Sequence, residues 1–182
     1  MEENVGIVGG HPIPVNDKKT AAGFASHTIW LMHHYVSMVQ PKIGEIIAFR
    51  DIGIRLSTRN SGDEDALKME LEKAGYRSIY APDAKIYNKG PEILSDFIKQ
   101  RTRVNIGESC IKMEHGLDIP TRNMKVLYPA FIDTMKELGP HPVMLIISAA
   151  AETYSRAKAY LHVRFGKGDI SVWDPVKTTK KL

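Results

Sequence analysis

The stretch that decides the fold is residues 61–80, SGDEDALKMELEKAGYRSIY. Ser61 and Glu64 have the spacing of a capping box, in which each side chain satisfies a free backbone donor of the other residue. Apolar residues then recur at helical spacing from Leu67 onward, and Gly75 is typical of a residue that ends a helix. The stretch therefore predicts a helix that ends at Gly75 and is followed closely by a strand.

Short apolar segments on both sides of this helix predict strands. Residues 5–10, VGIVGG, predict a buried strand that ends in a glycine turn. Residues 43–50 contain Ile-Ile-Ala-Phe and predict a second strand. Two further short strands are expected at residues 78–80 and 85–87, on either side of a turn at 81–83 that contains Pro82.

The other segments predict one loop and several helices. Residues 11–19 carry two prolines and predict a loop, whereas residues 21–39 are mostly apolar and predict a helix. Gly90 and Pro91 are expected to open another helix, since proline is tolerated in a first turn. The final helices are expected at residues 129–138 and 142–165.

Strands that alternate with helices, followed by helices alone, predict an α/β fold with flanking helices and a helical C-terminal extension. We expect an α/β part over residues 1–125, and a helical extension with a basic tail over residues 126–182. The expected strands are few for a complete doubly wound sheet, and only four residues precede Val5. The chain is therefore expected to be part of a larger fold.

Composition narrows the possible partners. The 182 residues carry a formal net charge of +4, which suits nucleic acid, an anionic membrane surface or a phosphorylated substrate. The basic residues are dispersed and no nucleic-acid motif is present, so nucleic acid is not expected as a partner. The single cysteine, Cys110, excludes an internal disulfide framework and fits a reducing compartment. We therefore expect a cytoplasmic protein, with peripheral attachment to the inner face of the membrane as an alternative.

Asp63, Glu64 and Asp65 place three carboxylates at the start of the predicted helix. The helix dipole stabilises such side chains by about 0.3–1 kcal/mol each, which is a structural explanation. A carboxylate on a rigid helix start can also deprotonate a substrate hydroxyl, which is a functional explanation. The triplet matches the Asp-x-Asp pattern of a metal site, but that pattern should follow an apolar strand, and here it follows residues 60–62, NSG. No metal ligand is predicted.

Residues 100–103, QRTR, form a second candidate site. Arg101, Arg103 and Gln100 could clamp a diphosphate, because guanidinium groups offer paired donors to phosphate oxygens. Basic residues near a helix end also complement the helix dipole, and spacing alone favours this second explanation.

The histidines predict packing rather than chemistry. His27, His33 and His34 have no cysteine or carboxylate partner at a metal-site spacing, so we expect them to be packed or partly exposed. Cys110 has no motif of a catalytic nucleophile around it.

Several motifs, in this order, are similar to those of family 2 glycosyltransferases. Residues 5–10 look like the strand that follows the family's metal-binding Asp-x-Asp segment, and residues 44–50 resemble its acceptor-side Gly-Glu…Ala-Phe-Arg segment. The acidic triplet, followed by residues 75–77 and 80–84, resembles the Glu-Asp helix, the Gly-Tyr turn and the Pro-Asp-Ala segment. Residues 100–104 are similar to the Gln-x-x-Arg-Trp motif. The resemblance covers most of the chain.

The resemblance implies a partial glycosyltransferase A-type sheet and an inverting mechanism, in which a carboxylate deprotonates the acceptor hydroxyl. Asp65 is the expected base, because it completes a Glu-Asp pair, although the family's usual spacing to Gly75 lies nearer Glu64. Asp63 belongs to the same candidate group.

The other matching residues would act on the substrates. Arg101 and Arg103 would neutralise the departing diphosphate, and Gln100 would orient that group or the acceptor. Gly44 and Glu45 belong to the segment expected to bind the acceptor side.

Two departures from the family pattern matter. Val104 stands where processive synthases have a tryptophan, which puts processive polymerisation in doubt. The family's nucleotide-binding strands and Asp-x-Asp would lie before Val5. We therefore expect no cofactor in this chain, Mg²⁺ or Mn²⁺ only in a complete enzyme, and no activity without a donor-binding half.

Two expectations about partners remain open. The acceptor is expected to be a glycan or a lipid-linked molecule, and residues 142–165 predict a helix that either lies on a membrane surface or packs on the α/β part. The alternative function is a non-catalytic module that binds a glycan, a lipid carrier or a partner subunit.

Overall fold

A computed structural model describes residues 2–55, 63–115 and 123–166. Within these ranges the chain is mixed α/β, as predicted. The elements in chain order are β1 (Val5–Pro14), α1 (Ala21–Val39), β2 (Ile47–Phe49), α2 (Asp63–Lys73), β3 (Arg77–Asn88), α3 (Leu94–His115), α4 (Met124–Leu138) and α5 (Pro142–Phe165).

The three strands form one sheet in the order β2-β1-β3, with β2 antiparallel and β3 parallel to β1. The predicted strands at 78–80 and 85–87 are parts of the single strand β3. The turn predicted between them is instead an irregularity in the pairing, because Gly9 lies opposite Tyr80 while His11 lies opposite Lys85.

Strand β1 continues to Pro14, so the loop predicted for residues 11–19 begins too early. The prolines were the reason for that prediction, since proline cannot donate to a sheet ladder. Strand β2 pairs with β1 only from Ile7 to Gly9, and the second half of β1 has β3 as its one strand neighbour in the described sheet. Prolines are tolerated there, as on an edge strand.

Gly6 and Gly10 explain the glycine-rich sequence of β1. A Cβ atom at Gly10 would lie 2.3 Å from Cγ2 of Ile46 and 2.7 Å from the carbonyl oxygen of Ala84. A Cβ atom at Gly6 would lie 2.5 Å from Cβ of Tyr76. Only glycine allows the neighbouring segments to approach β1 this closely.

The sheet-side core joins β1, α2 and the segment before β2. Ile7, Ile43, Leu67 and Leu71 are buried together there. The predicted end of α2 is confirmed, because Gly75 has a φ of +89°, a conformation that glycine adopts without strain. Ser61 and the capping contact predicted for it lie outside the described residues.

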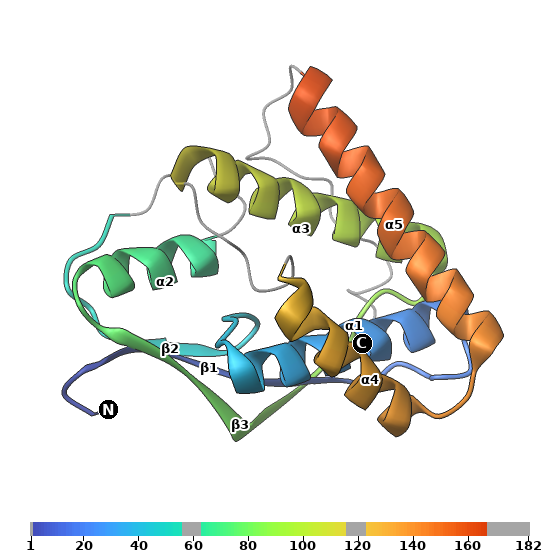
Figure 1. The fold of residues 1–182 in the computed structure, drawn as a ribbon, viewed down its shortest axis with the longest axis horizontal. Coiled ribbons are helices and arrows are strands. Elements are labelled where there is room, and N and C mark those ends of the chain that lie inside the picture. Colours follow the sequence, from blue (N-terminus) through green and yellow to red (C-terminus); the bar gives the residue numbers. More distant parts are fainter. Residues whose placement is uncertain (1, 56–62, 116–122, 167–182) are drawn as a thin grey trace.

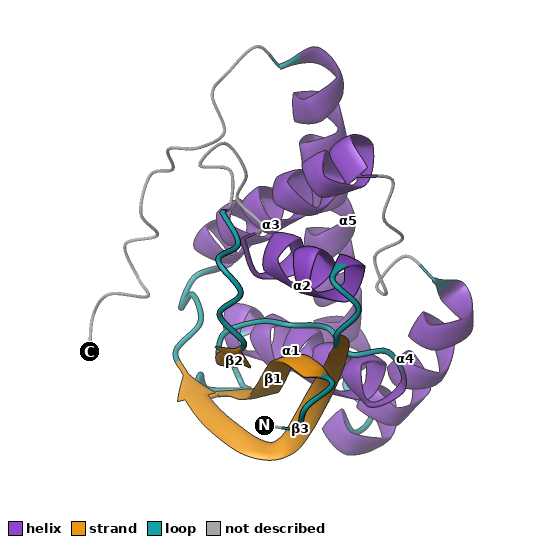
Figure 2. Cartoon of the chain, turned by 90° about the vertical axis from the view of Figure 1, so that its left-hand side faces the viewer, coloured by secondary structure: helices purple, strands orange, loops and turns teal. Residues whose placement is uncertain are grey.

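Helix α1 is central to the helical part of the fold (Figure 1), since it contacts β1, β3, α3, α4 and α5. Its bounds and those of α5 match the predicted ranges 21–39 and 142–165. Helix α4 begins earlier than predicted, at Met124, with Asn123 as its N-cap and Pro129 inside it. Figure 2 shows α2 and α3 on the same side of the sheet.

Helix α5 packs against the rest of the chain through small residues. Ser148, Ala151, Ser155 and Ala159 are buried, and Ala151 joins Phe97 of α3 and Ala25 of α1 in a second apolar cluster. One face of α5 therefore packs on the rest of the chain, which was one of the two arrangements expected for this helix. None of the helices in the described ranges has the length and apolar character needed to cross a bilayer.

Candidate functional site

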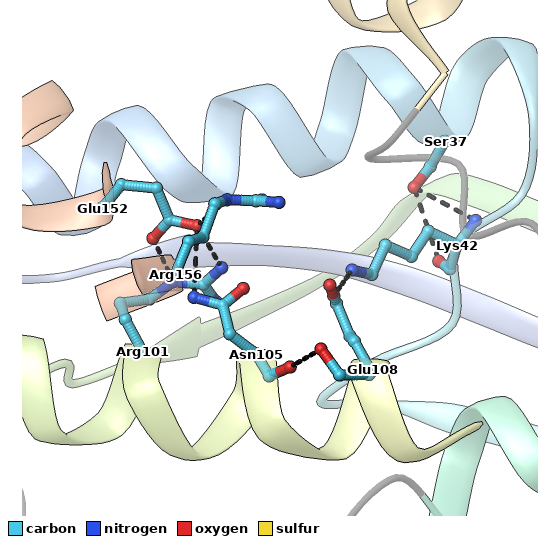
Figure 3. Close-up of polar contacts among 8 residues, drawn as sticks. Ser37, Lys42, Arg101, Asn105, Glu108, Glu152 and Arg156 are labelled. Atoms are coloured by element: carbon cyan, nitrogen blue, oxygen red, sulfur yellow. Dashed lines mark hydrogen bonds and ion pairs between the residues drawn. The ribbon is translucent and has the colours of Figure 1, made fainter. Parts of the chain in front are cut away.

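A row of polar side chains follows one side of α3. Arg101, Asn105 and Glu108 stand at helical spacing and point to the same side of the helix, toward α1 and α5 (Figure 3). Asn105 and Glu108 are buried, and the side chain of Arg101 is only 14% exposed. We call these three residues the α3 polar row.

Arg101 is held by Glu152 of α5. Its Nε donates to Oε2 of Glu152 at 2.8 Å and its Nη2 donates to Oε1 at 3.1 Å, which is a bidentate pair. Arg156 also donates to Oε1 of Glu152, at 2.8 Å. Burial would raise the pKa of Glu152, but the hydrogen bond from Arg101 and the charges of both arginines lower it to about 2.

Glu108, at the other end of the row, is paired with Lys42. Lysine Nζ lies 2.5 Å from Oε1 of Glu108. Burial would raise the pKa of Glu108, but the charge and hydrogen bond of Lys42, with the charges of Arg101 and Arg156, hold it below its ordinary value. A buried carboxylate is thus kept ionised by its cationic neighbours.

The loop that carries Lys42 is fixed by contacts on two sides. Oγ of Ser37, in α1, lies 3.4 Å from both the backbone nitrogen and the backbone oxygen of Lys42. On the other side, Nζ of Lys68 in α2 donates to the carbonyl oxygen of Pro41 at 2.6 Å. These contacts hold the backbone at residues 41 and 42, from which the Lys42 side chain reaches Glu108 of α3.

Asp65 lies in the first turn of α2 and is half-buried. Burial raises the pKa of its carboxyl group, Glu108 and Glu64 raise it further, and Lys42 and Lys68 oppose the rise without cancelling it. Glu108 also acts electrostatically on Arg101. The charge of Glu108 therefore influences both Asp65 of α2 and Arg101 of α3.

The acidic triplet is divided by its position on α2. Glu64 is exposed, whereas Asp65 is half-buried and feels the charges of Lys42 and Glu108. The backbone of Asp63 begins the helix, but its side chain lies outside the described residues. The surroundings of Asp65 raise the pKa of its carboxyl group.

The other predicted residues lie at the edge of this group. Gln100 is half-buried and Arg103 is exposed, each on a different side of α3 from Arg101. Gly44 lies against His33, since a Cβ atom at Gly44 would be 3.5 Å from Nε2 of that histidine. Glu45 is exposed and has a φ of +52°. Among the residues predicted to bind the diphosphate or the acceptor, only Arg101 lies in the buried polar group.

His33 adds an unpaired polar ring to the same region. It is buried, and neither ring nitrogen has a hydrogen-bond partner among the described residues. Burial, together with the charges of Lys42, His11, His34 and Arg101, lowers its pKa to about 3. The ring is therefore neutral at ordinary pH. Oδ1 of Asn105 and Oε2 of Glu108 are also buried without a partner in the described chain.

His27 and His34 make packing contacts, in line with the prediction that they are packed or partly exposed. Nε2 of His27 lies 2.9 Å from the carbonyl oxygen of Asn16. His34 stacks on His11 with ring centroids 4.1 Å apart, and its Nδ1 lies 2.8 Å from the Tyr80 hydroxyl. The described part of the chain contains no group of three or more His, Cys, Asp or Glu side chains arranged to hold a metal ion.

Several members of the site were missed at the sequence level. Asn105 and Glu108 follow Arg101 by four and seven residues, so helical spacing alone was a usable signal for them. Lys42 and Glu152 gave no such signal, because they lie 66 and 51 residues from their partners.

The arrangement combines two chemical capacities. A carboxylate whose pKa is raised by burial accepts a proton more readily at neutral pH than an exposed aspartate does. Lys42, Arg101 and Arg156 also bring three positive charges into the region, each paired with Glu108 or Glu152. No protein-family model, no curated protein and no solved structure matches this chain.

Proposed function

We propose that the chain is the acceptor-side part of an inverting, nucleotide-sugar-dependent glycosyltransferase of the glycosyltransferase A type, with Asp65 as its general base. The observation that carries the proposal is the position of Asp65. Its carboxyl group lies in the first turn of α2, where partial burial and the charge of Glu108, which also acts on Arg101, raise its pKa. The ordered motifs of the sequence support the same assignment.

The proposed reaction is a single displacement at the anomeric carbon of the donor sugar. The acceptor hydroxyl oxygen forms the new bond to that carbon while its proton passes to Asp65. The bond between the carbon and the diphosphate oxygen breaks, and the nucleoside diphosphate leaves with the electron pair. The burial that raises the pKa of Asp65 supports its role as proton acceptor.

Arg101 and Arg156 would supply positive charge to stabilise the leaving diphosphate. Arg101 is bonded to Glu152, but Arg156 shares that carboxylate, and their two positive charges are only partly neutralised by it. Arg103 and Gln100, on neighbouring faces of α3, would contact the diphosphate or the acceptor from outside the buried group. In the proposal each of these residues acts by charge and orientation.

The donor sugar and any Mg²⁺ or Mn²⁺ would be held by a donor-binding part, in the same polypeptide or in a second one. The acceptor would be a glycan or a lipid-linked molecule. A cytoplasmic location at the inner face of the membrane would bring the chain close to a lipid-linked acceptor, and the exposed residues Val143, Ile146 and Tyr154 of α5 are suited to a membrane surface.

The test is a transfer assay in cells that normally make the protein. A deletion strain is complemented with the wild-type chain, Asp65→Asn, Glu64→Gln or Glu70→Gln. Membranes and extracts are then supplied with radiolabelled UDP- or GDP-sugars and divalent metal. We expect deletion to remove one transfer product, the wild-type chain to restore it, and Asp65→Asn to lower it roughly 100-fold or more.

Glu70→Gln is the matched control, because Glu70 lies on the same helix but pairs with Lys73 at the surface. It should restore transfer fully. Full transfer by both Asp65→Asn and Glu64→Gln would contradict the proposed base.

One observation favours the alternative, a non-catalytic module that binds a glycan, a lipid carrier or a partner subunit. Both donor atoms of Arg101 described above are engaged by Glu152, which gives this arginine a structural role. If the deletion strain loses no transfer product, this alternative replaces the enzymatic proposal.

A further inference from the structure

We propose that a pocket between β1, α1 and the end of α4 binds an uncharged six-membered ring that carries hydroxyl groups, such as a monosaccharide unit or a cyclitol. The pocket has a volume of about 150 Å³. It is lined mainly by the second half of β1 and by α1, together with Lys18 and Glu137. Its lining includes none of the residues assigned above to proton transfer or to the diphosphate, so the proposal does not rest on the proposed function.

The size of the pocket fits one ring. A protein cavity of about 150 Å³ holds a molecule of benzene, whereas pockets for drug-sized ligands have volumes of roughly 300–1,000 Å³. A single six-membered ring therefore fits inside, and a second ring linked to it would lie outside the pocket.

The walls of the pocket combine apolar surface with hydrogen-bonding groups. Trp30 and Leu31 of α1, with the buried prolines of β1, contribute apolar surface that suits the C–H groups of a ring. The Lys18 ammonium can only donate hydrogen bonds, and the ionised Glu137 carboxylate can only accept them. A hydroxyl group both donates and accepts, so the hydroxyls of one ring can pair with both side chains.

Two stacked histidines fix further polar groups of the pocket. The ring centroids of His11 and His34 are 4.1 Å apart, and the ring planes differ by 16°. Nδ1 of His11 lies 3.3 Å from the carbonyl oxygen of Pro82, which can only accept, so this nitrogen carries a proton. Nδ1 of His34 lies 2.8 Å from the hydroxyl oxygen of Tyr80. Burial raises the pKa of Tyr80, so its hydroxyl keeps its proton and can donate to His34.

These contacts give the two Nε2 atoms opposite roles. Among the described residues, none is hydrogen-bonded to Nε2 of His11 or His34. In the neutral His11 ring, Nε2 accepts a hydrogen bond because Nδ1 carries the proton. In His34, Nε2–H donates one because Nδ1 accepts from Tyr80. One acceptor and one donor on neighbouring rings match two hydroxyl groups of one ligand.

The charges of the pocket are balanced. Lys18 supplies one positive charge and Glu137 one negative charge, and the Tyr35 hydroxyl donates to Oε2 of Glu137 at 2.7 Å, which positions that carboxylate. Burial lowers the pKa values of His27 and His34, so both rings are neutral at ordinary pH. A net charge near zero favours an uncharged ligand over a carboxylate or a phosphate.

The test is an NMR titration of the whole chain with glucose, methyl glucoside and myo-inositol. We expect dissociation constants on the order of millimolar, as for ligands of about 12 non-hydrogen atoms, and shifts of the Trp30 indole and His34 imidazole signals. Cyclohexanol, which has the ring with a single hydroxyl, and glucuronate, which adds a negative charge to the sugar, should both bind more weakly.

Two variants test the polar groups of the pocket. His11→Phe keeps an aromatic ring and removes Nε2, and Glu137→Ala removes an acceptor at the surface. Each should weaken polyol binding by about threefold to tenfold, the effect of one hydrogen bond. Asp133→Ala is the matched control, because Asp133 is an exposed carboxylate one turn earlier on α4 and pairs with Lys136. It should leave the affinity unchanged, and Glu137→Ala decides the question if His11→Phe does not fold.

Four results would each overturn the proposal. They are cyclohexanol binding as tight as that of the polyols, tighter binding of glucuronate, no shift of the Trp30 and His34 signals at polyol concentrations about tenfold above the expected dissociation constant, and unchanged affinity in folded Glu137→Ala.

The three polyols also distinguish the source of the ligand. Methyl glucoside that binds as well as glucose assigns the pocket to a sugar unit at the end of a glycan, whose anomeric oxygen is substituted. Binding of glucose or inositol alone assigns it to a free small molecule. Asp65→Asn should bind the polyols as the wild-type chain does, so a failed transfer assay leaves this proposal standing and failed polyol binding leaves the proposed function standing.

Discussion

The sheet-side core and the α3–α5 interface are stabilised by different interactions. Beside the sheet, Ile7, Leu67 and Leu71 are packed in an apolar cluster. Between α3 and α5, Arg101 and Glu152 form a largely buried ion pair, to which Arg156 adds a further contact. The first region depends on the burial of apolar surface, and the second depends on matched charges.

This difference determines how each region responds to change. Apolar burial stabilises roughly in proportion to area and does not depend on pH. A buried ion pair adds little net stability, because desolvation offsets the attraction, but the loss of one partner leaves an uncompensated charge. The polar interface therefore tolerates replacement of the whole pair better than replacement of one member.

The largest effect is expected from breaking the polar interface on one side. Arg101→Met should lower the free energy of unfolding by about 3–5 kcal/mol, because Glu152 would lose its buried bidentate partner. The double variant Arg101→Met/Glu152→Met should recover most of that loss. Urea unfolding at neutral pH measures the free energy of unfolding of both variants. A double variant as unstable as the single one would contradict the explanation by an uncompensated charge.

The matching change in the sheet-side core is Leu71→Ala. Leu71 is fully buried, so its truncation should lower the free energy of unfolding by about 3 kcal/mol through lost transfer energy and a cavity. The loss should be the same at pH 4 and pH 7, unlike that of Arg101→Met. A strong pH dependence of the Leu71→Ala effect would show that the two regions are not independent.

The pH dependence of stability should come from the polar interface. The pKa of Glu152 is lowered from 4.5 to about 2 in the folded chain. Its stabilisation is therefore present above about pH 4.5 and is lost as the pH falls toward 2, with a total of roughly 3 kcal/mol. Urea unfolding between pH 5 and pH 2.5 measures the slope of the free energy of unfolding against pH.

In Glu152→Gln this slope should be shallower, because the group no longer titrates. Glu108 contributes in the same direction, since its pKa is also lowered, whereas the raised pKa of Asp65 contributes in the opposite direction. An unchanged slope in Glu152→Gln would show that other carboxylates control the acid response.

The smallest effect is expected from an ion pair at the surface. Lys136 and Asp133 lie 2.8 Å apart on α4, with both side chains well exposed. Lys136→Ala should change the free energy of unfolding by less than about 0.5 kcal/mol, and high salt should reduce even that. A loss as large as that of Arg101→Met would mean that burial does not explain the difference between the pairs.

Local sequence signals predicted some elements well and others poorly. The apolar pattern gave the bounds of α1 and α5, and Gly75 marked the end of α2, because these signals act within a few residues. The prolines of β1 suggested a loop, but the short pairing with β2 leaves that part of the strand tolerant of proline. Pro82 suggested a turn, but pairing with β1 keeps β3 continuous.

The candidate site likewise combines residues that local sequence motifs predicted with contacts that those motifs did not predict. The sequence alone singled out Asp65 and Arg101, because their charges lie within recognisable local motifs. Only the tertiary structure decided the ion pairs of the site, since Lys42 meets Glu108 across 66 residues and Arg101 meets Glu152 across 51. A local sequence pattern does not reveal such contacts, because burial and charge pairing arise only when separate elements pack together.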